Sequence, residues 1–133
     1  MNPYIGPAGE FYVLAALYRR GLDATVTLGT TKSVDIVVRR VGRPAATVEV
    51  KTSADKNLNF MVGKSVIHDD PDHFYVFVYF GSAFTDVEVM PEIYVVPSLE
   101  MRALMRTYEK VPQMNAALLK HSRFRNGWSA LTD

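Results

Sequence analysis

The stretch SVDIVVRRVGRPAATVEVKTS, residues 33–53, restricts the folds open to this chain more than any other segment. Two runs rich in valine and isoleucine flank a Gly-Arg-Pro sequence, which is typical of two β-strands joined by a tight turn. Because successive side chains of a strand point to opposite faces, Val48 and Val50 share one face while Glu49 and Lys51 share the other. The segment therefore predicts strands at 33–41 and 45–52, each with one apolar and one charged face.

The same stretch predicts its own register. A turn centred on Gly42 pairs residues whose numbers sum to 84, so Asp35 lies directly opposite Glu49 and Ile36 lies opposite Val48. A register one residue different would set the apolar side of one strand beside the charged side of the other. We therefore expect the two carboxylates to lie together.

Two carboxylates directly opposite each other destabilise a sheet unless a cation lies between them. Hard divalent ions take oxygen ligands, and Mg²⁺ typically uses one or two protein carboxylates plus water and substrate phosphate. Lys51, on the same face as Glu49, is placed to orient or deprotonate a water, or to offset charge on a phosphate. A third acid, Glu10, falls on the inward apolar stripe of the first expected helix. Either it reaches solvent at the end of that stripe, or it reaches the same metal or Lys51.

The other periodicities predict one sheet flanked by helices. Residues 6–22 have the apolar spacing of a helix, and residues 24–29 indicate a short strand. HFYVFVYF at 73–80 is apolar at nearly every position, as expected of a central strand covered on both faces. EIYVVP at 92–97 indicates another strand, and Ser98 is the expected N-cap of an amphipathic helix through about residue 108. A second short helix should follow Pro112, and residues 53–65 hint at an edge strand through Leu58, Phe60 and Val62.

The composition predicts a single globular domain over residues 1–133, because 48% of the residues are hydrophobic and 22% are charged. The chain has no cysteine, which excludes a disulfide framework, a thiolate zinc site and a cysteine nucleophile. No apolar run approaches the roughly 20 residues of a membrane span. The N-terminal sequence lacks the basic-then-apolar order of a signal peptide. We therefore expect a cytoplasmic protein with no membrane partner.

The formal net charge is +1, so contact with a polyanion would have to come from a local patch. Between residues 102 and 125 the chain carries one acid, Glu109, and six basic residues: Arg102, Arg106, Lys110, Lys120, Arg123 and Arg125. This run is equally typical of an ordinary solvated face. HDDPDH, residues 68–73, has the residue types of a metal cluster, but aspartate and proline before a buried strand favour turn chemistry.

The arrangement Asp-x13-Glu-x-Lys across a β-hairpin, preceded by a helix with an acid near its start, resembles the PD-(D/E)XK nuclease superfamily. GEFYVLAALYRRGLDATVTLGTTKSVDIVV, VEVKTS, FYVFVYF, IYVVPS and the closing FRNGWSAL look like small bacterial members. The resemblance implies an α/β fold of the restriction-endonuclease-like type, a central mixed β-sheet flanked by α-helices. Val34 stands where the superfamily has its name-giving proline, a position that varies widely among members.

The resemblance also implies roles for particular residues. In the superfamily the acids matching Asp35 and Glu49 bind Mg²⁺ (or Mn²⁺), and the carbonyl of the residue matching Val50 often helps. The lysine matching Lys51 serves the attacking water, and the helix acid matching Glu10 binds or positions the metal. The implied function is a metal-dependent nuclease that hydrolyses phosphodiester bonds. DNA is the expected substrate, ahead of RNA as the less favoured alternative.

The alternative is a catalytically inactive module that keeps the nuclease fold and binds nucleic acid or protein. The set of Asp35, Glu49, Lys51 and Glu10 favours the enzyme, because a binding module has no need of clustered carboxylates. The modest basic patch favours the module. Because one small domain with such a patch holds a duplex poorly, we also expect a homodimer or a complex with a partner protein.

Overall fold

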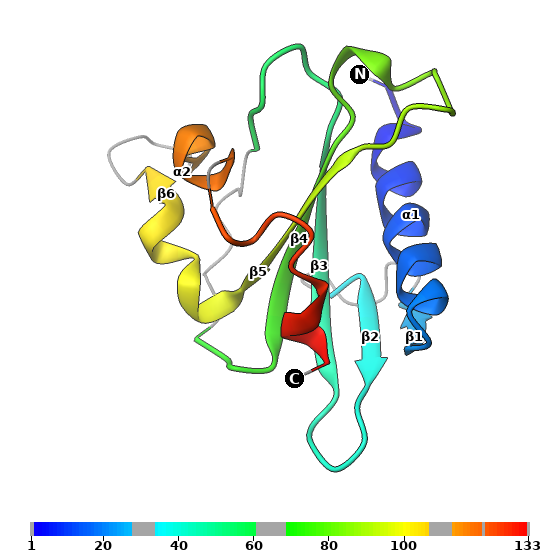
Figure 1. Cartoon of the computed structure of the whole chain (residues 1–133), viewed down its shortest axis with the longest axis vertical. Coiled ribbons are helices and arrows are strands. Elements are labelled where there is room, and N and C mark those ends of the chain that lie inside the picture. The colour runs from blue at the N-terminus through cyan, green and yellow to red at the C-terminus, as the bar shows by residue number, and fades with distance from the viewer. Residues whose placement is uncertain (1, 28–33, 61–68, 107–112, 121, 133) are drawn as a thin grey trace.

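The computed structural model describes residues 2–27, 34–60, 69–106, 113–120 and 122–132. Over these ranges the chain forms an α/β structure in which the helix α1 (Ile5–Arg19) packs on a five-stranded mixed sheet (Figure 1). Its strands, in spatial order, are β1 (Asp23–Val26), β2 (Ile36–Arg39), β3 (Ala46–Ser53), β4 (His73–Tyr79) and β5 (Glu92–Pro97). β3 and β4 run parallel, and the other neighbouring strands run antiparallel.

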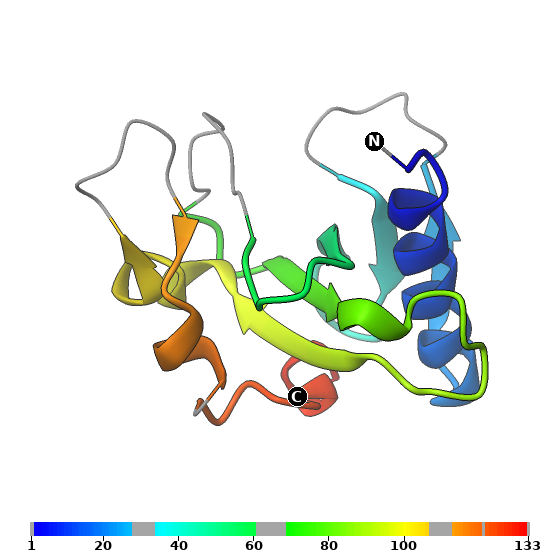
Figure 2. The ribbon, with the colours of Figure 1, turned by 90° about the horizontal axis from the view of Figure 1, so that it is seen from above.

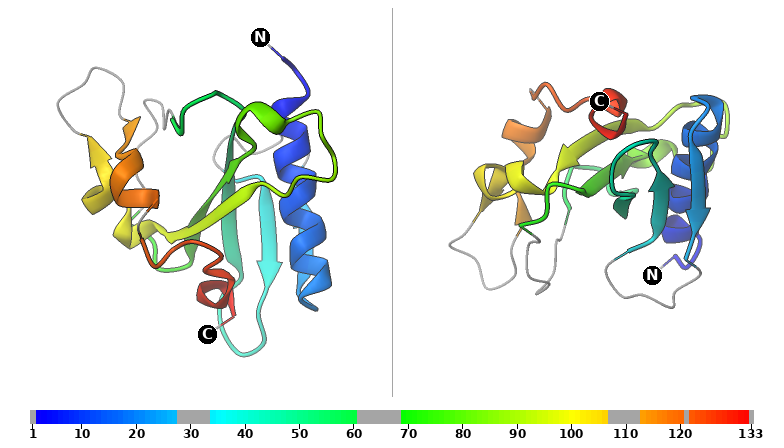
Figure 3. Two further views of the ribbon diagram at one scale, coloured as in Figure 1. Left: turned by 45° about the horizontal axis from the view of Figure 1, so that its top comes forward. Right: turned by 90° about the horizontal axis from the view of Figure 1, so that it is seen from below.

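Short elements complete the described chain. A 3₁₀ turn, η1 (Gly81–Ala83), follows β4, and two more, η2 (Ser98–Glu100) and η3 (Arg102–Leu104), follow β5. The two-residue strands β6 (Met105–Arg106) and β7 (Gln113–Met114) pair with each other, and α2 (Ala116–Lys120) and η4 (Trp128–Leu131) come next. Figures 2 and 3 show α1 and the group around α2 on opposite sides of the molecule, with the sheet between them.

Different elements cover the two faces of the sheet. On one face α1 and η4 pack against the strands through a cluster that includes Val13, Leu17, Val48, Val76, Trp128 and Leu131. On the other face the segment from η2 to α2 packs on β4 and β5 through a cluster that includes Tyr75, Phe77, Tyr94, Met101, Leu104 and Leu119. All the residues of β4 from His73 to Val78 are buried, which confirms the expected central strand.

The β2–β3 hairpin has the register expected from its sequence. Ile36 lies opposite Val48, and Val38 lies opposite Ala46. All four side chains are fully buried, so the apolar faces of the two strands coincide. Gly42 has φ of 75°, a left-handed conformation that glycine adopts without a Cβ clash.

The helix α1 approaches β3 most closely at Gly9. A Cβ atom on Gly9 would lie 1.8 Å from the Thr52 Oγ1 atom and 2.8 Å from the Thr52 Cβ atom. Further along the same helix face, Val13 and Leu17 are fully buried against the sheet. Glu10 follows Gly9 directly, so the close contact at Gly9 brings the Glu10 carboxyl group to the sheet.

Two expected elements differ from the structure. The segment after Ser98 forms 3₁₀ turns and then β6 in place of the expected α-helix, and Ser98 is the first residue of η2, with Pro97 at the N-cap position. The buried side chains Met101 and Leu104 are three residues apart, which suits the three-residue turn of a 3₁₀ helix. Residues 107–112 lie outside the described ranges.

The edge strand hinted at in residues 53–65 is absent from the described part, residues 54–60. Phe60 is buried there, with its ring 4.9 Å from the Phe77 ring, so its apolar character reflects a core contact and not strand pairing. The expected short helix after Pro112 is present as α2. Within the described ranges, no helix is long and apolar enough to cross a membrane.

The contact at Gly9 predicts that Gly9→Ala lowers stability. Alanine favours a helix over glycine by about 1 kcal/mol, but overpacking against Thr52 costs typically 1–3 kcal/mol, so we expect a net loss of about 1 kcal/mol. Gly6→Ala is the matched control, because a Cβ atom on Gly6 of the same helix meets nothing within 4 Å. Chemical denaturation measures both variants. Equal stabilisation by the two substitutions would show that α1 does not need glycine at the sheet.

Candidate functional site

The strand β3 presents different chemistry on its two faces. Val48 and Val50 belong to the core under α1, and Thr52 contacts Gly9 of that helix. Glu49 and Lys51 alternate with these residues and lie on the opposite face. The strand therefore carries its two charged residues away from α1, as the alternation predicts.

Glu49 is a buried carboxylate with only part of its hydrogen-bonding capacity used. Its side chain is 7% exposed, and its Oε2 atom lies 2.8 Å from the Lys51 Nζ atom. Its Oε1 atom lies 3.9 Å from the His73 Nε2 atom and has no hydrogen-bond partner among the described residues. Burying a charged oxygen in that state costs free energy, because the oxygen has lost its hydrating water and has gained no hydrogen bond in return.

Asp35 stands just before β2 and bonds to β3 through both backbone and side chain. Its N–H donates to the Val48 carbonyl at 2.8 Å, and its Oδ2 atom accepts from the Val50 N–H at 2.7 Å. The Val50 nitrogen belongs to the peptide that joins Glu49 to Val50. Asp35 therefore lies beside the peptide that follows Glu49, at the point where β2 begins.

Glu10 reaches Asp35 from α1. The Glu10 carboxyl group, when protonated, forms a side-chain hydrogen bond with Asp35. Burial, the hydrogen bond to Asp35 and the negative charge of Asp35 together raise the pKa of Glu10 from 4.5 to about 7. The sequence predicts that Glu10 reaches either solvent or the same metal or Lys51, and the structure instead places its carboxyl group beside Asp35.

The expected site residues thus form two pairs, Glu10 with Asp35 and Glu49 with Lys51. The Glu49–Val50 peptide connects them, because it carries Glu49 and donates its N–H to Asp35. Over the described ranges, no three aspartate, glutamate, histidine or cysteine side chains gather closely enough to hold a metal ion together. As the side chains stand, the arrangement combines a carboxyl pair, in which the pKa of Glu10 is raised, with a buried, lysine-paired carboxylate.

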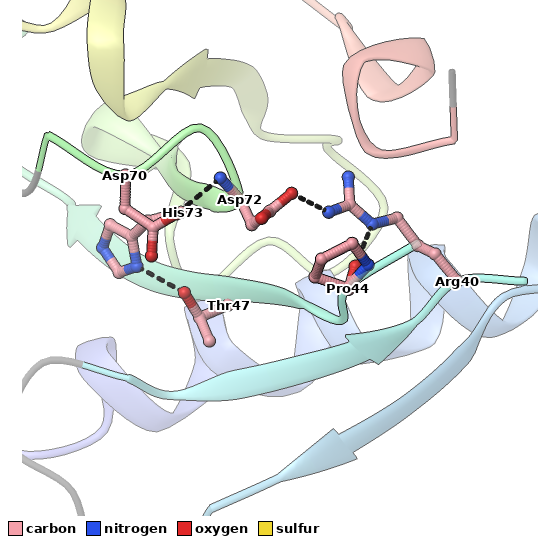
Figure 4. A network of polar contacts seen from close by, with 6 residues as sticks. All are labelled: Arg40, Pro44, Thr47, Asp70, Asp72 and His73. Carbon is pink, nitrogen blue, oxygen red and sulfur yellow. Dashed lines mark hydrogen bonds and ion pairs between the residues drawn. The ribbon is translucent and has the colours of Figure 1, made fainter. Parts of the chain in front are cut away.

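His73 is a neighbour of the site that the sequence reasoning missed. Its Nδ1 atom lies 2.7 Å from the Thr47 Oγ1 atom (Figure 4). Its Nε2 atom lies 3.9 Å from the Glu49 Oε1 atom. The parallel pairing of β3 with β4 sets Thr47 opposite His73. No local pattern in the sequence carries that register, because the two strands are joined by a long connection.

The turn before β4 uses its aspartates structurally. The Asp70 Oδ1 atom accepts from the Asp72 N–H at 2.8 Å, and the Asp70 carbonyl accepts from the His73 N–H at 3.2 Å. Asp72 forms an ion pair with the buried guanidinium of Arg40, whose Nε atom also donates to the Pro44 carbonyl (Figure 4). This is the expected turn chemistry for residues 69–73, and His68 lies outside the described ranges.

A surface cleft of about 460 Å³ opens at the C-terminal end of β3, next to the start of α1. Lys51 lies on its wall, and its side chain is 28% exposed. The other lining residues come from the first turn of α1 and from the chain after β3: Asn2, Ile5, Gly6, Thr52, Ser53, Ala54, Asp55, Asn59 and Phe60. The Glu49–Lys51 pair therefore extends from a buried position to a cleft that a ligand can enter.

The basic run between residues 102 and 125 is partly neutralised. Arg102 lies 3.3 Å from Asp69, and Arg123 lies 3.0 Å from Glu100. Lys110 and the side chain of Arg106 lie outside the described part of the chain. These two exposed ion pairs leave less net positive charge for a polyanion around Arg102 and Arg123.

The raised pKa of Glu10 predicts how stability changes with pH. Protonated Glu10 contributes stability fully below about pH 4.5, and the contribution is lost as the pH rises through about 7. Glu10→Gln keeps a donor toward Asp35 at every pH, so it should unfold at a higher temperature than wild type at about pH 8 and show little difference at about pH 5. Thermal unfolding in EDTA measures this, with exposed Glu88→Gln as the control. An equal difference at both pH values would contradict the carboxyl pair.

Comparisons with protein-family models, with curated proteins and with solved structures find no match to this chain. A functional assignment therefore depends on the chemistry of its own residues.

Proposed function

We propose that this chain is a metal-dependent nuclease of the restriction-endonuclease-like fold, hydrolysing phosphodiester bonds of DNA. The observation that carries the proposal is the Glu49 carboxylate, which is buried beside Lys51 with its Oε1 atom unsatisfied. A carboxylate in this state stabilises a cation strongly, because it has already lost its hydration. The alternation of β3 sets it on the face that carries Lys51.

A hard divalent cation takes oxygen ligands of the kind that these residues carry. Glu10, Asp35 and Glu49 would supply carboxylate oxygens if their two separate pairs moved together, and the Val50 carbonyl is the further oxygen expected from the superfamily. A proton on Glu10 offsets its repulsion with Asp35, and Mg²⁺ or Mn²⁺ would take the same role. Such an ion, when bound, lowers the pKa of a water ligand and polarises a phosphate.

Lys51 is the residue that we assign to the attacking water. Its ammonium group is held 2.8 Å from the Glu49 Oε2 atom and borders the cleft at the end of β3. A cation held by Glu49 would weaken this ion pair and leave the ammonium group to orient water or to offset charge on the phosphate. A phosphodiester in the cleft would then meet Lys51 from the open side.

The inactive binding module is the second candidate. It is favoured by one observation: in the described ranges the acids form separate pairs and no group of three gathers. A module of this kind would keep Glu10 and Asp35 as a structural hydrogen bond and Glu49 with Lys51 as a structural ion pair. Metal binding and cleavage distinguish the two candidates.

Metal binding should depend on the acids. We expect Mn²⁺ or Mg²⁺ to raise the unfolding temperature of the wild type at about pH 8, where the Glu10–Asp35 proton is most easily displaced. Asp35→Asn should lose most of this effect, because the amide keeps an acceptor for the Val50 N–H but removes the charge. Calorimetric titration with Mn²⁺ gives the affinity directly. Equal Mn²⁺ binding by the wild type and Asp35→Asn would contradict the proposal that Asp35 is a metal ligand.

Cleavage should require Lys51. We expect plasmid, linear or single-stranded DNA to be cut with Mg²⁺ or Mn²⁺ and to survive in EDTA. Lys51→Ala should lose about 10²–10³ in rate, because the transition state loses a positive charge and the water loses its positioning group. Arg43→Ala, an exposed residue of the β2–β3 turn, makes the same change in net charge and should cut normally. No cleavage with either metal would favour the binding module.

A further inference from the structure

The outward face of α1 carries a regular stripe of exposed apolar side chains. Tyr4 is 72% exposed, and Phe11 and Tyr18 are each 55% exposed. These three aromatic residues are seven positions apart, so they lie on one side of the helix. Pro7 and Ala15, also exposed, fall between them on the same side. We name these five residues the α1 stripe.

The α1 stripe carries no charge. From Tyr4 to Tyr18 the chain has one charged residue, Glu10, and its carboxyl group is bound to Asp35. The outward face of a helix in a soluble domain normally carries polar and charged residues. A contiguous apolar surface of this kind marks a place where another molecule packs.

The spacing of the residues in the α1 stripe is the same when it is read from either end of the helix. Its positions, 4, 7, 11, 15 and 18, are symmetric about residue 11. If a second copy of α1 lies antiparallel on the first, Tyr4 meets Tyr18 of the second copy, Pro7 meets Ala15 of the second copy, and Phe11 meets Phe11. A two-fold interface requires this self-complementarity, in which residue i contacts j and j contacts i.

We propose that the protein forms a two-fold homodimer through antiparallel packing of α1 on α1, with Phe11 at the symmetry axis. The spacings of three, four, four and three residues keep the α1 stripe on one side of the helix, as in a helix–helix seam. Pro7 and Ala15 are small enough to let the two helices approach between the aromatic rings. The aromatic pairs then pack ring against ring in the offset or edge-on geometries that they prefer.

The surface is held in place before a partner arrives. The Tyr18 hydroxyl donates to the Ala24 carbonyl at 2.8 Å, which fixes the ring while leaving its face exposed. On the opposite side of the helix Val13 and Leu17 are fully buried, so α1 cannot rotate away from this orientation. Little ordering entropy remains to be lost on association.

The available area suits a reversible dimer. An aromatic side chain presents about 150–250 Å², so the exposed fractions leave roughly 350 Å² on the three rings of each copy. Two copies bury roughly 700 Å² from the rings alone, and the flanking residues raise the total toward the roughly 1,200 Å² at the lower end of specific interfaces. Met90, 78% exposed on the loop that runs beside α1, is one such flanking residue.

A nucleic acid fits this surface less well than a second copy. Bases stack on exposed aromatic rings, but neighbouring rings of the α1 stripe are roughly 10 Å apart along the helix axis. Phosphates need cations along the strand, and near the α1 stripe the helix offers them only at its C-terminal end, in Arg19 and Arg20. The dimer does not depend on the carboxyl groups of Glu10, Asp35 and Glu49 forming a metal site.

Sedimentation of the full chain over a range of concentrations tests the dimer. We expect the wild type to reach twice the chain mass of 14.9 kDa and Phe11→Arg to remain at the monomer mass, because two guanidinium groups would meet at the axis. Val41→Arg is the control, since Val41 is 97% exposed in the β2–β3 turn, and it should dimerise like the wild type. A monomeric wild type, or an unchanged dimer in Phe11→Arg, would overturn the proposal.

Disulfide crosslinking tests the geometry, because the chain has no cysteine of its own. Under mild oxidation Phe11→Cys should crosslink to itself. Tyr4→Cys should crosslink with Tyr18→Cys when the two variants are mixed, and much less when either is alone. Efficient crosslinking of Tyr4→Cys alone would indicate parallel helices and would contradict the antiparallel arrangement. These readouts do not involve metal or DNA, so they separate the dimer from the proposed nuclease activity.

Discussion

The hydrogen bond from the Val50 N–H to the Asp35 Oδ2 atom connects the start of β2 to the middle of β3, and the site is arranged around it. It exists only in one register of the β2–β3 hairpin. That register is held by burial: Ile36 and Val48 are fully buried opposite each other, and a slip of one residue would expose them. Fully burying one such side chain contributes about 1.5–3 kcal/mol, so the apolar face holds the acids in place although the acids themselves gain little from it.

The acids are in a strained electrostatic state as a result. Burial and the neighbouring Asp35 raise the pKa of Glu10, and Glu49 is buried with one oxygen unsatisfied beside a lysine. Replacing such groups with apolar residues of similar volume is often neutral or stabilising in other proteins. Keeping these three carboxyl groups in and around the β2–β3 hairpin lowers the stability of the fold, which is typical of functional sites.

The hairpin shows how far the sequence alone can be taken. Period-two alternation predicts which residues share a face, and the requirement that apolar faces coincide predicts that Ile36 lies opposite Val48. The same reasoning cannot place His73, because the β3–β4 pairing is parallel and its register depends on a long connection. Nor does it show that Glu10 meets Asp35 while Glu49 meets Lys51, since a side chain chooses its partner by rotamer and local burial. The sequence predicts an α-helix after Ser98, whereas the structure has a 3₁₀ turn there. An apolar spacing of three residues fits an α-helix and a 3₁₀ helix equally well over a single turn.

The helix α1 meets two independent constraints, and its composition reflects both. Gly9 lets it approach Thr52, which places Glu10 at the sheet, and Val13 and Leu17 anchor it there. These contacts explain the residues on the inward side of α1 only, and they do not depend on which residues the outward side carries. If water covered that outward side, lysine and glutamate would be the favourable choices on grounds of helix propensity and solubility. Phe11 and Tyr18 instead keep more than half of their surface exposed, an arrangement that becomes favourable when a second apolar helix covers them. Because Glu10 and Phe11 are adjacent on one rigid helix, a dimer through the α1 stripe would hold the two Glu10–Asp35 pairs in a fixed relation across the symmetry axis.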